Sequence, residues 1–181
     1  MVVVETTPLP AVTVHQPWAW SIRVAHSPLL NMDWRPPPSL ADQYIALHVG
    51  KAWTKRERLN ASVLSGRLHP EFEVPLGPES YIFSKVFAVA RVAGFVDLEY
   101  GADRGAFGRI QETSRGRAWI GGQFDDETVE RILASKWWHG PCGWALRHIR
   151  PLPEPITLSG KPRVWTVPSP IALKAAAQVG V

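Results

Sequence analysis

Apolar positions in the first third of the chain predict two strands, each followed by a helix. Residues Val12–His15 form a β-branched run, and Pro17 suits the first turn of a helix that extends to about Ala25. The apolar run Tyr44–Val49 is typical of a buried strand. Thr54 can then cap a polar helix over residues 55–65, closed by Gly66.

Longer apolar runs in the second half predict the centre of a sheet. Tyr81–Leu98 is rich in Val, Phe and Ala and predicts one or two core strands, with Gly94 as a possible bulge. Residues 118–120 form a brief strand candidate within a glycine- and arginine-rich stretch, 100–123. Asp125 or Asp126 begins a helix that ends near Trp137, and residues 143–167 predict short strands that alternate with proline turns.

Three other segments lack a clear period. Residues 27–40 contain four prolines, which donate no backbone hydrogen bond, so we expect an irregular loop around Trp34 and Arg35. Residues 66–80 predict a surface connection. Residues 170–181 predict a weak helical turn or a frayed tail.

This order of elements favours an α+β fold over a doubly wound parallel sheet, because the predicted strands are short and their connections irregular. We expect a mixed, strongly curved sheet or small barrel with short flanking helices. No linker divides the 181 residues, so the whole chain is predicted to be one domain. Its core spans about residues 11–168, between a short N-terminal arm and a C-terminal tail.

Composition narrows the class of protein. Apolar residues make up 45% of the chain and charged residues 20%, which is typical of a globular protein. No apolar run approaches the roughly 18 residues of a membrane span, and Met1–Pro10 lacks the pattern of a signal peptide. The lone Cys142 cannot form an internal disulfide. We therefore expect a cytoplasmic protein without a membrane partner, and a monomer is assumed.

Several kinds of catalysis lack their sequence motifs. Neither glycine-rich phosphate loop occurs, the G-x-S-x-G elbow of serine hydrolases is missing, and Cys142 sits where a small buried residue would serve equally well. The six histidines show no i, i+4 pair around a glutamate. A metal site would require long-range convergence of His15, His48 or His139, so we predict no metal and no cofactor.

Tryptophan and basic residues point instead toward nucleic acid. The net charge is +4, and nine tryptophans are several times the ordinary number. Between Lys51 and Arg67 five basic residues face one acid, Glu57, with Trp53 among them. Cations bind phosphates and indole rings stack on bases, although such a segment can also be a solvated face. The second basic segment contains Arg104, Phe107, Arg109, Arg115 and Arg117.

Five motifs in order resemble the ASCH family of the PUA-like superfamily. His15–Ala19 reads HQPWA after a strand, Trp34–Pro36 reads WRP, and Leu47–Lys51 reads LHVGK. Ala88–Asp97 resembles the family's central strand. The closing motif is the most specific: GPCGWAL at 140–146 is followed by prolines at 151–155, Gly160-Lys161 and Val164-Trp165.

The resemblance implies a small PUA-like β-barrel with a cleft beside its first helix. The family includes acetylcytidine amidohydrolases, a reported ribonuclease and nucleic-acid-binding modules. Active members carry a Lys/Glu/Arg or Lys/Thr motif after the first helix, and those positions fall here on Ser27, Pro28, Leu30 and Met32. A shift of one residue gives His26 or Pro28, Asn31 and Asp33, which restores neither the Lys nor the Arg. Loss of the ammonium group argues against the family's amidase chemistry.

We therefore predict a module that binds RNA, DNA or a modified nucleoside, with Gln16 bonding an amide, Trp18 and Trp34 stacking, and Arg35 and Lys51 holding phosphate or carbonyl oxygens. Core packing is an alternative role for each tryptophan. The other candidate site residues are Ser27, Asn31, His48 and Trp53. A second hypothesis is a diverged hydrolase, a nucleoside amidohydrolase or ribonuclease, whose base would be His26, His48 or Lys51. A third is a protein-interaction domain with exposed tryptophans.

Overall fold

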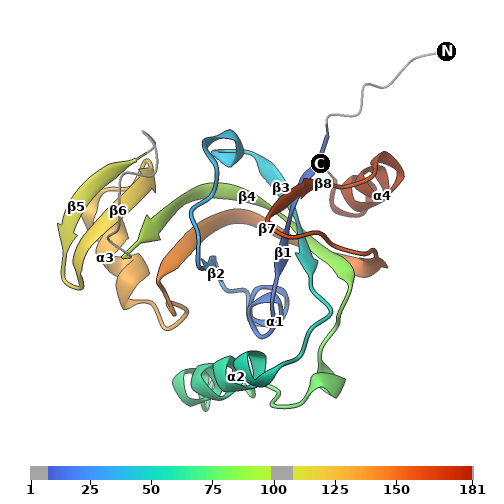
Figure 1. Cartoon of the computed structure of the whole chain (residues 1–181), viewed down its shortest axis with the longest axis horizontal. Helices are drawn as coiled ribbons and strands as arrows, with labels where there is room; N and C mark the ends of the chain where they lie inside the picture. The colour runs from blue at the N-terminus through green and yellow to red at the C-terminus, as the bar shows by residue number, and fades with distance from the viewer. Residues whose placement is uncertain (1–7, 99–107, 181) are drawn as a thin grey trace.

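The computed structural model describes residues 8–98 and 108–180, which form an α+β fold around an eight-stranded mixed sheet (Figure 1). Four α-helices and two short 3-10 helices accompany the sheet in the described part of the chain. The strands are β1 (Pro10–Val14), β2 (Leu29–Met32), β3 (Tyr44–Val49), β4 (Lys85–Asp97), β5 (Arg109–Thr113), β6 (Gly116–Gly122), β7 (Cys142–Thr157) and β8 (Val164–Thr166). The helices are α1 (Trp18–Arg23), η1 (Pro38–Leu40), α2 (Lys55–Leu68), η2 (Pro78–Ser80), α3 (Asp126–Ala134) and α4 (Ser169–Val179).

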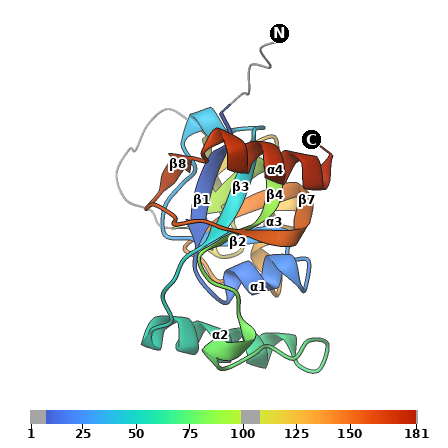
Figure 2. The same cartoon turned by 90° about the vertical axis from the view of Figure 1, so that its right-hand side faces the viewer.

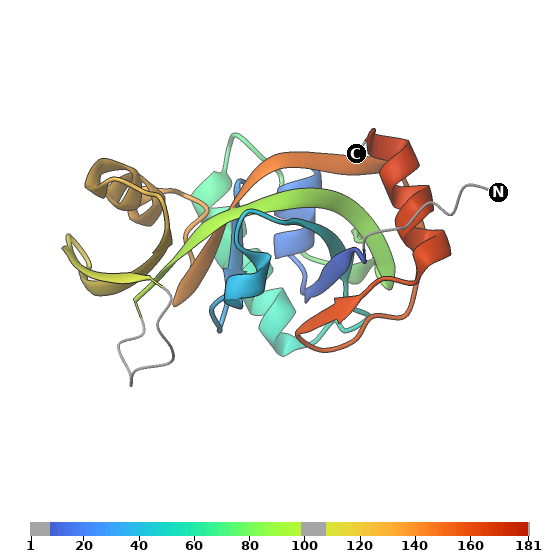
Figure 3. The same cartoon turned by 90° about the horizontal axis from the view of Figure 1, so that it is seen from above.

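Two long antiparallel strands, β4 and β7, form the centre of the sheet and arch across the molecule (Figure 3). The strand order is β2-β7-β4-β3-β1-β8, and β6 pairs with the last residues of β4 and with β5. The register between β4 and β7 shifts near Gly94, whose φ is +159°. A Cβ there would lie 2.2 Å from the Gly121 carbonyl oxygen, so glycine permits the close approach of β6.

Parallel pairing occurs between β1 and β3, while every other described pair of strands is antiparallel. Both strands are predicted by their apolar runs, and β3 has the expected bounds. Their side chains join the main core, with Val12, Ile45 and Leu47 fully buried. The carboxyl ends of the two strands therefore meet at one edge of the sheet, where ligands commonly bind.

The helices lie on different sides of the sheet, with α2 beyond α1 (Figure 2). Helix α1 is short and buries Trp18, Ala19 and Ile22 in the main core. Thr54 caps α2 as expected, but the helix continues through Gly66 to Leu68, because buried Leu64 and Leu68 pack in the core. Helix α3 begins after Asp125, as the sequence predicts, and ends at Ala134, before the expected Trp137.

Short strands were predicted over residues 143–167, and the three-residue β8 is one. The rest of that prediction was wrong, because β7 is one strand of 16 residues that contains three prolines. Pro151 pairs with Ala88, and the next paired residue of β7 is Ile156. The ladder is thus interrupted over the intervening residues. Pro153 and Pro155 lie where no backbone donor is required, which explains why they do not end the strand.

Three further segments are more ordered than the sequence predicts. The loop predicted over residues 27–40 contains β2, which pairs with the start of β7, and η1. The brief strand at 118–120 is part of β6, and β5 completes a hairpin with it. Residues 170–181, expected to form a weak helical turn or a frayed tail, lie largely in α4, an 11-residue helix whose Ala172 and Ala175 pack in a second core cluster with Leu152 and Trp165.

In the described residues no ladder joins β2 to β8, the two ends of the strand order, so the sheet is not a closed barrel. None of the described helices has the length and apolar character needed to cross a membrane.

Candidate functional site

A cavity of about 720 Å³ lies where the carboxyl ends of β1 and β3 meet. Segments distant in sequence form its walls: the start of α1, the end of β2, the first turns of α2, and the loops around 139–141 and 159–163. Its side chains that carry chemistry are Thr13, His15, Trp18, Asn31, Asp33, Trp34, His48, Lys51, Arg56, Glu57, Asn60, Ser84, His139, Ser159, Lys161 and Arg163. A volume in this range suits a small organic ligand.

Two of the predicted tryptophans, Trp18 and Trp34, line this cavity. Trp18 is 6% exposed, and its ring lies 4.9 Å from that of His139. Trp34 is half-buried and meets the Trp144 ring edge-on at 4.8 Å. Both rings therefore pack against the core and also border the cavity, and their stacking on a base stays a prediction.

Four cationic side chains line the cavity: Lys51 and Arg56 from the β3–α2 connection and the first turn of α2, and Lys161 and Arg163 from the loop before β8. Among the described residues none of the four forms an ion pair. The guanidinium of Arg163 lies 5.8 Å from the Trp34 ring centre, within cation–π range. Asp33 and Glu57 are the two carboxylates of the cavity wall, so positive charge prevails.

His48 is a structural part of the cavity wall. Its Nε2 lies 2.9 Å from the Leu158 carbonyl oxygen, and its Nδ1 lies 3.3 Å from Oγ1 of Thr13. Burial lowers the pKa of His48, although the hydrogen bond to the Leu158 carbonyl opposes this. A Cβ on Gly160 would lie 2.3 Å from Cε1 of His48. With both ring nitrogens engaged, His48 ties the loop before β8 to the sheet.

Asn31 positions the segment that carries His139. Its Nδ2 donates to the Trp137 carbonyl at 2.9 Å, and its Oδ1 accepts from the His139 backbone N–H at 2.9 Å. His139 Nδ1 is buried without a hydrogen-bond partner. Burial, with the nearby charges of Arg67 and Arg56, lowers the pKa of His139. A neutral imidazole therefore faces Trp18 in the cavity wall.

His15 and Glu57 meet in the same cavity. Nδ1 of His15 lies 3.3 Å from Oε1 of Glu57, and the side chains are 59% and 5% exposed. Glu57 closes the capping box of α2, accepting from the backbone N–H of Thr54 at 2.7 Å and from its hydroxyl. Burial works against ionisation of Glu57, but these hydrogen bonds, with the charge of His15, lower its pKa.

Four predicted site residues do not reach the cavity: Gln16, Ser27, Arg35 and Trp53. Gln16 is 1% exposed, and its amide donates to the Ile82 carbonyl and accepts from the Trp20 N–H. Ser27 is buried in the turn before β2, where its hydroxyl bonds the backbone of Leu29.

Arg35 follows Trp34 and points the other way, to Asp97, with Nε and Oδ2 2.5 Å apart. It is therefore engaged within the protein and does not line the cavity, which favours a structural role for it. Of the nine predicted residues, Trp18, Asn31, Trp34, His48 and Lys51 line the cavity.

Trp53 lies outside the cavity as well. Its ring packs on Tyr81 at 4.9 Å, and its Nε1 is buried without a hydrogen-bond partner. Burial raises the pKa of the Tyr81 phenol. The aromatic pair thus braces the connection between β3 and β4.

Only the first of the two predicted basic segments contributes described side chains to the cavity. From the first, Lys51 and Arg56 line the cavity, while Arg67 donates to the Trp138 carbonyl. In the second, Arg109 pairs with Asp126 and Arg117 with Glu112 on the surface of the β5–β6 hairpin. Arg104 and Phe107 lie outside the described residues.

The absent lysine after α1 does not deprive the cavity of ammonium groups. The position that aligns with it, Ser27, faces the interior, while Lys51 and Lys161 reach the cavity from other segments. Sequence reasoning missed Arg56, Lys161, Arg163 and the pair of His15 with Glu57 as site residues. The closing Gly160-Lys161 motif was the available signal for one of them.

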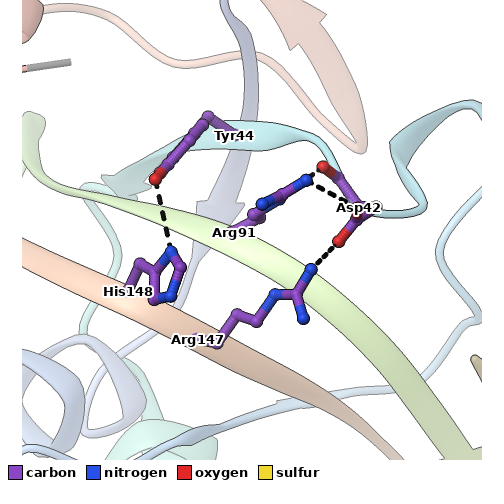
Figure 4. A network of polar contacts seen from close by, with 5 residues as sticks. All are labelled: Asp42, Tyr44, Arg91, Arg147 and His148. Atoms are coloured by element: carbon purple, nitrogen blue, oxygen red, sulfur yellow. Dashed lines mark hydrogen bonds and ion pairs between the residues drawn. The ribbon is translucent and has the colours of Figure 1, made fainter. Parts of the chain in front are cut away.

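A second polar cluster lies outside the cavity (Figure 4). Asp42 accepts from Arg91 at 2.6 Å and from Arg147, and the Tyr44 hydroxyl lies 3.4 Å from Nδ1 of His148. The residues come from β4, β7 and the region around the start of β3, so the cluster ties neighbouring strands together. Because the Asp42 carboxylate already engages both guanidiniums, this cluster stabilises the sheet.

In the described part of the chain no three His, Cys, Asp or Glu side chains are grouped so as to hold a metal ion. His15, His48 and His139 border the same cavity, but they form no such group. Comparison with known proteins found no family model that matches the chain and no curated protein that matches it.

Proposed function

We propose that this protein is a nucleic-acid-binding module whose cavity takes one unpaired or modified nucleotide of RNA or DNA. The observation that carries the proposal is the combination of two indole rings with four cations, which form no ion pair within the described residues, around one cavity of about 720 Å³. Aromatic rings stack on any base, and Lys and Arg side chains bind phosphate. The volume accommodates a nucleotide, which is a drug-sized ligand.

The arrangement of the cations supports a ligand that crosses the cavity. Lys51 and Arg56 come from one segment, the β3–α2 connection and the first turn of α2. Lys161 and Arg163 come from the loop before β8. Trp34 lies beside Arg163. A base stacked at Trp34 would thus have guanidinium and ammonium groups nearby for its own phosphate and for a neighbouring one.

We also propose that the chain is a divergent ASCH domain with a PUA-like barrel that is open here between β2 and β8. The motifs that carry the resemblance support this, because HQPWA, LHVGK, GPCGW and GKPRVW contribute residues to one cavity. A cytoplasmic location is consistent with the single buried thiol of Cys142.

Binding of labelled single-stranded RNA and DNA, measured by fluorescence anisotropy at about 50 and 200 mM salt, tests the proposal. Each phosphate contact on a single strand contributes a slope of about −0.7 in log K against log salt. Replacing one contacting cation should therefore weaken binding about fivefold at 0.1 M salt. We expect this for Lys51→Ala and Arg163→Ala.

Matched controls are available on other surfaces. Lys174 is exposed on α4 and Arg58 is exposed on α2, and neither lines the cavity. Lys174→Ala and Arg58→Ala should bind as the wild type does. Equal effects of the cavity variants and these controls, or binding that does not respond to salt, would reject the proposal.

A further inference from the structure

His15 and Glu57 together have the geometry of a general-base pair. The Glu57 carboxylate is 5% exposed, and its Oε2 accepts two hydrogen bonds from Thr54, which fixes the side chain. Its other oxygen, Oε1, is 3.3 Å from Nδ1 of His15. A carboxylate at Nδ1 selects the tautomer with a proton on Nδ1, so Nε2 is left as the acceptor.

His15 is exposed enough to contact a ligand, since 59% of its side chain is accessible. It also belongs to the cavity wall that carries Lys51 and Arg56. The other two histidines of the cavity differ: His48 has both nitrogens engaged, and His139 Nδ1 is buried. Within the described residues, His15 is the cavity histidine that combines a carboxylate partner with an accessible ring.

We infer that His15, positioned by Glu57, is a general base that cleaves single-stranded RNA bound in the cavity through attack of the RNA's own 2′-hydroxyl. This inference rests on the proposed function, since it requires the nucleic-acid site. It adds an activity to that site and selects RNA over DNA. The sequence had pointed to His26, His48 or Lys51 as the base of a diverged hydrolase, and none of these has the geometry of His15 with Glu57.

The reaction balances with groups that the cavity and its substrate provide. Nε2 of His15 removes the proton of the 2′-hydroxyl, and the 2′-oxygen forms a bond to the adjacent phosphorus. The bond from phosphorus to the 5′-oxygen of the next nucleotide breaks, and that oxygen takes a proton from water. The hydroxide left by that water accepts the proton held by His15. The products are a 2′,3′-cyclic phosphate and a free 5′-hydroxyl.

The surrounding charges favour this reaction. Attack at phosphorus concentrates negative charge on the phosphoryl oxygens, which cations stabilise. Lys51 and Arg56 precede Glu57 in the chain and line the same cavity, as do Lys161 and Arg163. Because the substrate brings its own nucleophile, the protein must supply a base, the cations and the stacking surface.

The experiment uses the full chain and short fluorescent RNA, with the same sequence in 2′-O-methyl form. The wild type should cleave the RNA to a product that ends in a 2′,3′-cyclic phosphate, detected by mass spectrometry, and should bind the 2′-O-methyl strand without cleavage. His15→Gln should lower kcat about 100- to 10,000-fold, as is typical for loss of a general base, and keep binding. His69→Gln is the matched control, because His69 is exposed and lies outside the cavity.

Glu57 is a positioning residue and requires a readout that folding alone would not change. Glu57→Gln should lower kcat and leave KM unchanged, and its stability is measured separately because the capping box loses a charge. Added imidazole should restore cleavage by His15→Gly and have no such effect on Glu57→Gln, which retains its own imidazole.

Each result decides between the two proposals. RNA that binds but stays intact overturns the catalytic inference and leaves the binding proposal standing. Cleavage that persists in His15→Gln, or that occurs on the 2′-O-methyl strand, overturns the assignment of the base. Absence of binding to either strand overturns the proposed function itself.

Discussion

The sequence predicts that Arg35 binds nucleic acid, but in the structure Arg35 forms an ion pair with Asp97. Replacing Arg35 tests whether its role is structural or in binding. The guanidinium and the carboxylate are 17% and 9% exposed, with Nε 2.5 Å from Oδ2. The guanidinium also lies 5.0 Å from the centre of the Trp119 ring. Arg35→Ala removes the ion pair and the cation–π contact and leaves a mostly buried carboxylate without this partner.

The expected cost follows from this burial. Breaking a buried ion pair costs about 3–5 kcal/mol, and exposed pairs are worth about 0–1 kcal/mol. Because the Arg35 side chain retains some contact with solvent, we expect a loss of about 2–4 kcal/mol in the free energy of unfolding. For a domain of this size that corresponds to a decrease in Tm of about 4–16 °C.

Urea denaturation followed by tryptophan fluorescence measures this loss, with Arg58→Ala as the control at an exposed position on α2. The control should stay within about 0.5 kcal/mol of the wild type. RNA binding below the unfolding transition should be the same for Arg35→Ala and the wild type. Unchanged stability together with weakened binding would refute the structural role and restore Arg35 as a phosphate ligand.

Three other variants or conditions test the cavity. Trp34→Ala should weaken nucleic-acid binding by about 1–3 kcal/mol, while Trp34→Phe keeps most of it, and equal anisotropy titrations for both variants and the wild type would contradict the stacking role. Gly160→Ala should destabilise the fold by about 1–3 kcal/mol in the same urea assay, because its Cβ would lie 2.3 Å from Cε1 of His48. Its control is Gly66→Ala, whose Cβ meets nothing within 4 Å and which should stabilise α2 by about 0.5–1 kcal/mol. Burial lowers the pKa of His48 and of His139, so the unfolded chain binds protons more readily than the folded chain does. The free energy of unfolding should therefore fall as the pH decreases below about 6.5, and a free energy of unfolding that stays constant between about pH 7 and 5 would contradict this.

Sequence signals within a few residues predicted the elements that are stabilised by their own burial pattern or caps. The apolar run of β3 gave its bounds, Thr54 capped α2, and Pro17 preceded α1. These signals act over a few residues, through side-chain burial and capping of free backbone groups, so a single sequence contains them.

Other elements depended on partners elsewhere in the chain. Strand β7 contains Pro151, Pro153 and Pro155, which favour turns locally, and it remains a strand because its ladder with β4 is interrupted between Pro151 and Ile156. Strand β2 has only four residues and is held by pairing with the start of β7. Whether a proline's missing donor matters depends on which side of the strand a neighbour occupies.

The amino-acid sequence by itself determined the α+β class, the positions of strands β1 and β3, and the group of basic residues near Lys51 and Trp53; the parallel pairing of β1 with β3 came from the tertiary structure. The tertiary structure decided which of those side chains share a cavity: it brought Lys161, Arg163 and His139 to Lys51, turned Arg35 toward Asp97, and placed His15 against Glu57. The physical reason is that a side chain's partner is set by the direction in which its backbone presents it and by the packing of distant segments. Neither quantity is encoded in the spacing of neighbouring residues.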